Sequence, residues 1–193
     1  MPLPPPAARR PSHTRKVTYQ GYRRDDGLWD IEAHLHDSKP FAFEVPGEVS
    51  WQANEAIHDL QIRLTLDNTF LVHAVAVAMN HVPHDGCPQA QAPMQRLVGA
   101  RLTRGWRRTI EEQLGGVQGC THLRELLFNM ATAAFQTMPH VFSGQDPQVK
   151  PMHLDRCVTW DSTTELVQRR YPLHHRPRTP NAAETPSPSP STP

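Results

Sequence analysis

Cys120 is the residue of this chain with the clearest potential for chemistry, because of where it stands. It follows the glycine-rich segment 115–119 and directly precedes a long apolar pattern that predicts a helix. Exposed amide groups and the positive end of the dipole at a helix N-terminus favour the thiolate form of a cysteine. A thiolate is both a nucleophile and a ligand for soft metal ions. His122 falls in the first turn of the same helix and can approach the same point.

Three further residues stand at junctions where a side chain can point outward. Cys87 follows a tight polar loop, and His58 and Asp59 stand at the start of a predicted strand, where they compete for one role. Two sulfurs, one imidazole and one carboxylate form a tetrahedral set suited to Zn²⁺, and less closely to iron. The predicted metal ligands are therefore Asp59, Cys87, Cys120 and His122, with His58 as the substitute for Asp59.

An enzymatic role for the same thiol is the alternative to metal binding. Cys120 would be the nucleophile and His122 or His58 the base. Residues two apart in an α-helix point about 200° away from each other. His122 can therefore reach Cys120 only if Cys120 lies in the cap of the helix and not inside it.

Other candidates have simpler explanations. Free cysteines often pack as small apolar residues, and Cys157 is interpreted as structural. His34 and His36 share one side of a predicted strand, where they could bind a metal ion, but solvent exposure is the favoured interpretation. Asp25, Asp26 and their neighbours form a plain hairpin turn.

Four segments predict strands. Residues 29–36 alternate apolar and polar side chains, and 60–66 do the same, which is the pattern of a half-buried strand. Segment 17–23 precedes the first of them across an Asp-Asp-Gly turn, and 70–79 follows the second across an Asp-Asn turn. Short turns join antiparallel neighbours, so we predict an antiparallel meander.

The second half of the sequence changes to a helical period. Segments 90–98 and 106–114 predict short helices, and 123–138 carries the strongest apolar stripe of the chain. Strands followed by helices indicate an α+β fold of two layers, with the helices packed on one face of the sheet. In such a fold a strand start, a loop after the sheet and a helix N-terminus can meet at one end, so we expect the four predicted ligands to converge there.

Proline composition sets the expected domain limits. The chain has 193 residues and 20 prolines, which concentrate at the two ends. Such segments contain few apolar residues to bury. We predict disordered tails at 1–13 and 176–193 around a single domain at 14–175, in which 152–171 is a short appendage.

Charge and hydropathy exclude several classes of partner. The formal net charge is +1, so no strong field attracts nucleic acid, and the arginines between 101 and 108 are interpreted as a solvated helix face. The longest apolar stretch, 70–79, is too short to span a membrane. Arg9 and Arg10 are followed by no apolar run, so we do not expect the N-terminal segment to be a signal peptide. We expect a cytoplasmic protein, whose three cysteines are free thiols or ligands and not a disulfide framework.

Four long motifs resemble a bacterial family of unknown function, the one numbered 2889. They are GYRRDDGLWDIEAHLHDSK at 21–39, IHDLQIRLTLD at 57–67, LVGARLTRGWRR at 97–108 and GCTHLRELLFNMATAAFQT at 119–137. The resemblance covers nearly all of the predicted domain. It implies no activity.

The layout of 59–138 also resembles the U-type scaffold proteins of iron–sulfur cluster assembly. Asp59 and the hairpin after it match the aspartate and hairpin of that family, and Cys87 and Cys120 match its second and last cysteines. Its first cysteine falls on Ile57, so two thiols stand in place of three. The resemblance implies a scaffold-like fold and a bound Zn²⁺ or iron–sulfur species.

The function we predict is a metal-binding scaffold or sulfur-transfer accessory protein, and a non-enzymatic role is favoured. A cysteine-dependent enzyme using Cys120 is the first alternative. A non-catalytic interaction domain is the second, in which the Ser-Pro-rich tail binds a protein partner.

Overall fold

The computed structural model describes residues 2–47, 49–103, 105–138 and 146–178. The chain divides into two compact units, 1–138 and 139–193, and the predicted domain 14–175 includes parts of both. Residues 2–13 are exposed and have no regular secondary structure. Residues 179–193 of the predicted C-terminal tail lie outside the described residues. No described helix is long and apolar enough to cross a membrane.

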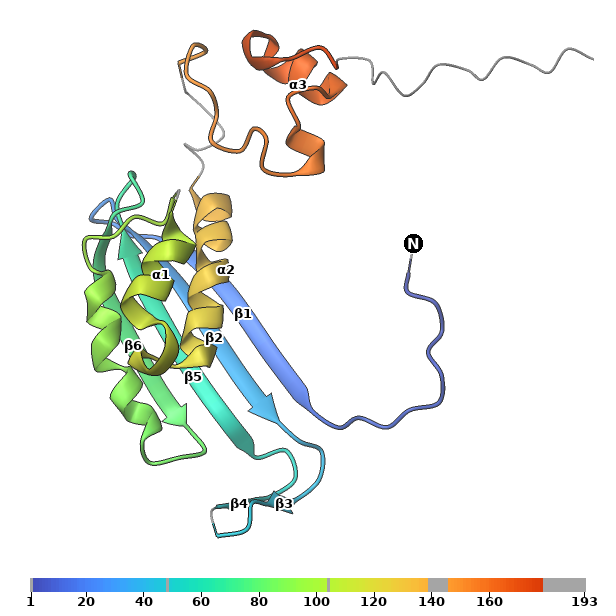
Figure 1. The fold of residues 1–193 in the computed structure, drawn as a ribbon, viewed down its shortest axis with the longest axis vertical. Helices are drawn as coiled ribbons and strands as arrows, with labels where there is room; N and C mark the ends of the chain where they lie inside the picture. Colours follow the sequence, from blue (N-terminus) through green and yellow to red (C-terminus); the bar gives the residue numbers. More distant parts are fainter. Residues whose placement is uncertain (1, 48, 104, 139–145, 179–193) are drawn as a thin grey trace, which may run out of the picture. The chain divides into compact units, whose positions relative to one another are not determined.

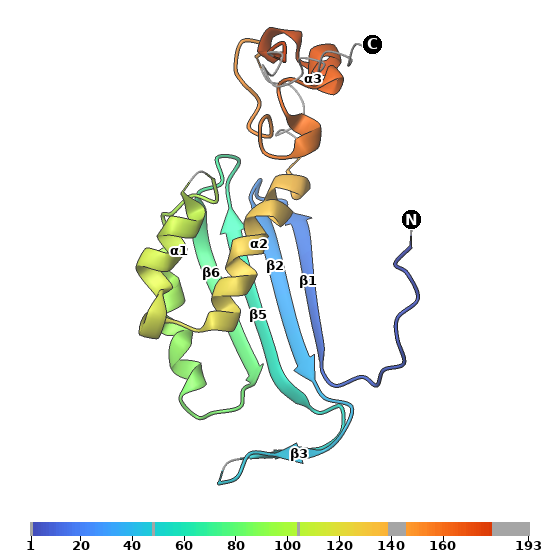
Figure 2. The same cartoon turned by 45° about the vertical axis from the view of Figure 1, so that its right-hand side comes forward.

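The first unit is built on one antiparallel sheet. Its strands are β1 (Thr14–Arg23), β2 (Trp29–Ser38), β5 (Ala56–Leu66) and β6 (Val72–His81), in the order β1-β2-β5-β6. Helices cover one face of this sheet (Figures 1 and 2). The structure therefore confirms the predicted α+β meander with helices on one face.

Strand periodicity decides which side chains face the helices. On β2, alternate residues from Trp29 to Leu35 are buried, and the same alternation continues to Asp37. On β5, Leu60, Ile62, Leu64 and Leu66 form the buried row. His58 shares the parity of this row, so it faces the helical layer, whereas Asp59 points to the other side of the sheet.

The helical layer follows β6. The 3₁₀ helix η2 (Ala92–Leu97) occupies the segment 90–98 where a helix was predicted, and a second 3₁₀ helix, η1 (Cys87–Ala90), precedes it. Each has a proline in its first turn. Then follow α1 (Trp106–Leu114), η3 (Gly116–Gln118) and α2 (Thr121–Thr137). The apolar stripe of α2 is buried, as its period predicts. The Trp106 indole donates a hydrogen bond of 2.8 Å to the carbonyl of Leu127 and joins α1 to α2.

A small hairpin that the sequence did not predict connects β2 to β5. It consists of β3 (Phe43–Glu44) and β4 (Ser50–Trp51) and extends beyond the end of the main sheet (Figure 1). The rings of Phe43 and Trp51 stack with their centroids 4.8 Å apart. The chain thus leaves the sheet just after Asp37 and returns just before His58.

Among its described residues, the second unit contains short helices and no strand. These are η5 (Val158–Trp160), α3 (Glu165–Arg170) and η6 (Pro172–His174). His153 packs between Trp160 and Tyr171. Cys157 is exposed in this unit.

Candidate functional site

A buried carboxylate lies at the centre of the candidate site. Asp37 is only 2 % exposed. The guanidinium of Arg15 on β1 binds both of its oxygens, each at 2.8 Å, which is the geometry of a strong bidentate pair. His58 on β5 lies with Nδ1 3.1 Å from Oδ2 of Asp37, and His13 lies with Nε2 3.3 Å from Oδ1. Arg15, His58 and His13, which directly precedes β1, therefore converge on one carboxylate.

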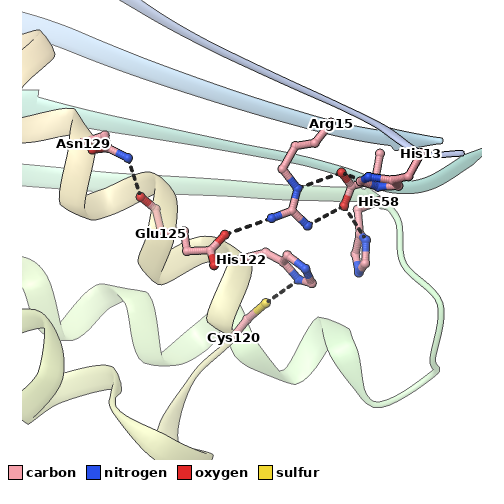
Figure 3. A network of polar contacts seen from close by, with 8 residues as sticks. His13, Arg15, His58, Cys120, His122, Glu125 and Asn129 are labelled. Carbon is pink, nitrogen blue, oxygen red and sulfur yellow. Dashed lines mark hydrogen bonds and ion pairs between the residues drawn. The ribbon is translucent and has the colours of Figure 1, made fainter. Parts of the chain in front are cut away.

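The start of α2 supplies the other half of the site. Cys120 is the N-cap residue and has extended backbone dihedrals, which is the condition under which His122 can reach it. The Cys120 Sγ lies 3.9 Å from Nδ1 of His122, and the rings of His122 and His58 have centroids 4.1 Å apart. Figure 3 shows the His122 ring between Cys120 and His58. Arg15 also reaches α2, where it donates to Glu125 at 3.0 Å.

The electrostatics of the carboxylate half keep Asp37 charged and His58 neutral. Burial raises the pKa of Asp37, but the hydrogen bond and charge of Arg15, with the charges of His13 and His58, outweigh it and lower that pKa. Burial lowers the pKa of His58, and repulsion from His122 lowers it further, against the attraction of Asp37. A neutral imidazole has one nitrogen available for a metal ion or a proton.

The electrostatics of the thiol half favour a thiolate beside an imidazolium. Burial raises the pKa of Cys120, but the hydrogen bond with His122 and the amides of Leu123 and His122 lower it overall. The same hydrogen bond raises the pKa of His122, against the effect of burial. Each partner therefore stabilises the charged form of the other.

The histidines and the carboxylate can hold a metal ion. Asp37, His58 and His122 each offer a ligand atom, and these atoms lie within 4.8 Å of one another. Among the described residues, no other group of three or more potential ligands has its ligand atoms this close together. Cys120 adjoins this group through its contact with His122.

The residues predicted from the sequence divide into two sets. Cys120, His122 and His58 come together at one end of the helical layer. Asp59 lies on the opposite face of the sheet, where its Oδ1 is 2.8 Å from Nε2 of His34. Cys87 begins η1 after β6 and is not part of the close group of ligand atoms.

Asp37, Arg15 and His13 are the functional candidates that sequence reasoning missed. A signal for Asp37 was present, because it continues the inward-facing apolar row of β2 and a carboxylate at such a position needs partners. Arg15 has the matching parity on β1, since the register pairs it directly with Asp37. His13 lies within the segment that was predicted to be a tail.

The fold and the site define a class of protein: an α+β domain with a partly buried cluster of histidine, aspartate and cysteine where the sheet meets a helix N-terminus. A family model described as "Protein of unknown function (DUF2889)" matches residues 13–136. The chain belongs to this family, as its four motifs predicted. The matched segment contains every residue of the cluster.

Comparison with other proteins adds no further relative. No curated protein matches the chain, and no solved structure matches it. The resemblance to the iron–sulfur scaffold proteins gains no support from these comparisons.

Proposed function

We propose that this protein binds one transition-metal ion in the first unit, through His58, His122 and Cys120, with Zn²⁺ as the best-fitting ion. The observation that carries the proposal is the convergence of Asp37, His58 and His122, whose ligand atoms lie within 4.8 Å of one another. Two imidazoles beside a carboxylate and a thiol are a set of donors typical of transition-metal sites in proteins.

Asp37 is better suited to orient His58 than to bind the metal directly. Both of its oxygens already accept hydrogen bonds from Arg15. One of them also accepts from Nδ1 of His58, which leaves the other ring nitrogen of His58 available to a metal ion. A carboxylate behind a metal-binding histidine fixes the tautomer and orientation of the ring.

Cys120 supplies the third ligand in this proposal. The sulfur and nitrogen ligands of one tetrahedral Zn²⁺ are separated by about 3.5 Å, given bonds near 2.3 and 2.0 Å. Cys120 Sγ and His122 Nδ1 are 3.9 Å apart, so a small rotation brings both to one ion. Three protein ligands leave a fourth position for water or a substrate.

An iron–sulfur cluster fits the same residues less well. Such clusters are usually held by several cysteine thiolates. The chain has three cysteines, and no group of three sulfurs occurs among the described potential ligands. A role in sulfur transfer remains compatible with a single reactive thiol, and the fourth metal position would then face the sulfur donor.

Cobalt substitution tests the proposed ligands. Tag-free protein treated with a chelator is titrated with Co²⁺, and the absorption band of a thiolate-to-cobalt charge transfer is recorded. We expect one such site per chain. The band should disappear in Cys120→Ser. In Asp37→Asn the band should remain, but the apparent affinity for Co²⁺ should fall roughly 10- to 100-fold, because the carboxylate that orients His58 is lost.

The two other cysteines provide matched controls. Cys157→Ser removes an exposed thiol in the second unit and should leave the band unchanged. Cys87→Ser should also leave it unchanged. Absence of the band in the wild-type protein, or its persistence in Cys120→Ser, would contradict the proposal. Loss in Cys87→Ser would restore the ligand set predicted from the sequence.

A thiol-dependent enzyme is the second candidate, and the contact between Cys120 and His122 favours it. The thiolate would attack an activated carbonyl, and His122 would return a proton to the leaving group. Chelator-treated protein is incubated with nitrophenyl acetate, and mass spectrometry follows the acetyl group. An adduct on Cys120 with one released nitrophenol per chain supports this role, and its equal formation in His122→Ala would contradict it.

A further inference from the structure

The face of the sheet opposite the helices carries a second group of histidines, around Asp59. His34 and His36 project to this face, because the alternate residues of β2 point toward the helices. Asp59 projects to the same face of β5, together with Gln61 and Arg63. This group is therefore separated from the buried cluster by the thickness of the sheet.

Strand register places four potential ligands on three neighbouring strands near one end of the sheet. Nε2 of His34 lies 2.8 Å from Oδ1 of Asp59. The pairing places Asp59 directly opposite His36 on β2 and opposite His81 on β6. Side chains directly opposite each other in a regular ladder have Cβ atoms about 4.5–5.5 Å apart. On the β6 side the register shifts between Asp59 and Leu60, and Asn80 donates to Oδ1 of Asp59 at 3.4 Å. No three of these ligand atoms lie as close together as those of Asp37, His58 and His122, so the imidazole rings must rotate to share one ion.

The surroundings allow these rings to turn toward a common ion. The His34 side chain is 42 % exposed, and His81 is exposed. His34, Ala76 and Ala78 line a solvent-open hollow of about 300 Å³, and His36, Asp59 and His81 do not line it. The small residues beside His34 leave space for its ring to rotate.

Stability alone is a weak explanation for this arrangement. An exposed ion pair such as His34 with Asp59 contributes about 0–1 kcal/mol.

We propose that His34, His36, Asp59 and His81 form a second binding site for a divalent transition-metal ion of the imidazole-preferring class, Zn²⁺, Ni²⁺ or Cu²⁺. The site lacks a sulfur ligand and is open to solvent, so it exchanges its ion faster than the buried cluster. It is independent of the function proposed for Cys120, since the two groups share no residue.

The test is a Co²⁺ and Zn²⁺ titration of tag-free full-length protein, with Cys120→Ser, His34→Ala/His36→Ala and His73→Ala variants. Wild-type protein should bind two ions per chain. The double histidine variant should bind one ion and keep the thiolate band. Its affinity for the ion at the second site should fall at least tenfold, because loss of an outer partner alone lowers metal affinity 10- to 100-fold. Cys120→Ser should lose the band and keep the ion on the open face.

His73 is the matched control, because it is an exposed histidine on β6 that contacts a single carboxylate, Asp67, at 3.0 Å. Its replacement should leave two ions bound. Unchanged stoichiometry and affinity in His34→Ala/His36→Ala would overturn the inference. A further outcome is that the wild-type protein shows no thiolate band but His34→Ala/His36→Ala still loses one bound ion. This outcome would support the inference about the open face and contradict the function proposed for Cys120.

Discussion

Asp37 shows how one residue links the stability of this fold to its candidate chemistry. It stands at the inward position of β2 where the apolar row ends, and a buried charge is tolerated there because Arg15, His58 and His13 surround it. Charge-assisted hydrogen bonds are about twice as strong as neutral ones. The same carboxylate orients His58 toward His122.

Asp37→Asn tests this contribution. Charge-assisted hydrogen bonds contribute about 1.5–3 kcal/mol, so we expect a loss of this size in the free energy of unfolding at pH 7, measured by urea denaturation. The pKa of Asp37 is lowered in the folded state. Its contribution is therefore present above the unfolded pKa of about 3.9 and is lost as the pH falls through the lower folded value.

The difference between wild type and variant should accordingly shrink below about pH 4. Asp26→Asn is the control, because Asp26 also pairs with an arginine, Arg24, but is exposed, and it should change stability little. A difference that stays constant across this pH range would show that the charge of Asp37 is not what stabilises the fold.

The thiol of Cys120 gives a second prediction at the scale of the residue. Its lowered pKa means that thiolate persists to lower pH than in an ordinary cysteine, whose pKa is about 8.5. In a Cys87→Ser/Cys157→Ser background with chelator, the rate of alkylation by iodoacetamide should reach half its maximum below that pH. His122→Ala should move this midpoint upward, and an unmoved midpoint would argue against the contact.

At the scale of elements, the end of α2 approaches β1 through a glycine. A Cβ atom at Gly21 would overlap the side-chain atoms Oγ1, Cγ2 and Cβ of Thr137, the last residue of α2. This close approach helps to hold α2 across the sheet, with Cys120 at its other end. The helix therefore needs a residue without a side chain on the strand below it.

Gly21→Ala tests the close approach. Overpacking of a fitted contact costs about 1–3 kcal/mol, so we expect that loss in the free energy of unfolding, measured by chemical denaturation. Thr137→Gly removes all three overlapping atoms, and the double variant should recover part of the loss. Gly27→Ala is not a suitable comparison, since Gly27 has a φ of +85°. Additive effects of the two substitutions would contradict a direct contact.

At the scale of the whole molecule, the cluster and the family match fall within one compact unit. The match covers residues 13–136 and the unit covers 1–138. All the residues of both candidate metal sites lie in this unit. The second unit contributes short helices and an exposed cysteine to the described part of the chain.

A fragment of residues 1–138 tests the independence of the first unit. We expect it to unfold in one cooperative transition and to keep the thiolate–cobalt band, because its sheet, its helices and its proposed ligands are complete. Circular dichroism and the Co²⁺ titration measure the two properties. A fragment that lacks cooperative unfolding would show that the second unit is needed for the fold.

Local patterns in the sequence determined the type and order of the main elements. Alternation predicted β2 and β5, the period of the apolar stripe predicted α2, and Trp106–Leu114 formed the helix that its spacing indicated, because each pattern depends on neighbours within a few residues. The position of Cys120 at a helix start followed from the same reasoning. The small hairpin of Phe43 and Trp51 is too short to leave such a pattern.

Only the tertiary structure decided which residues meet. His58 and Asp59 are adjacent in sequence and were interchangeable candidates, but strand geometry sends them to opposite faces, one to Asp37 and His122 and the other to His34. Arg15 and Asp37 are 22 residues apart and become partners through the register of β1 and β2. Contacts of this kind depend on pairing, parity and helix placement together, and no single stretch of the sequence contains that information.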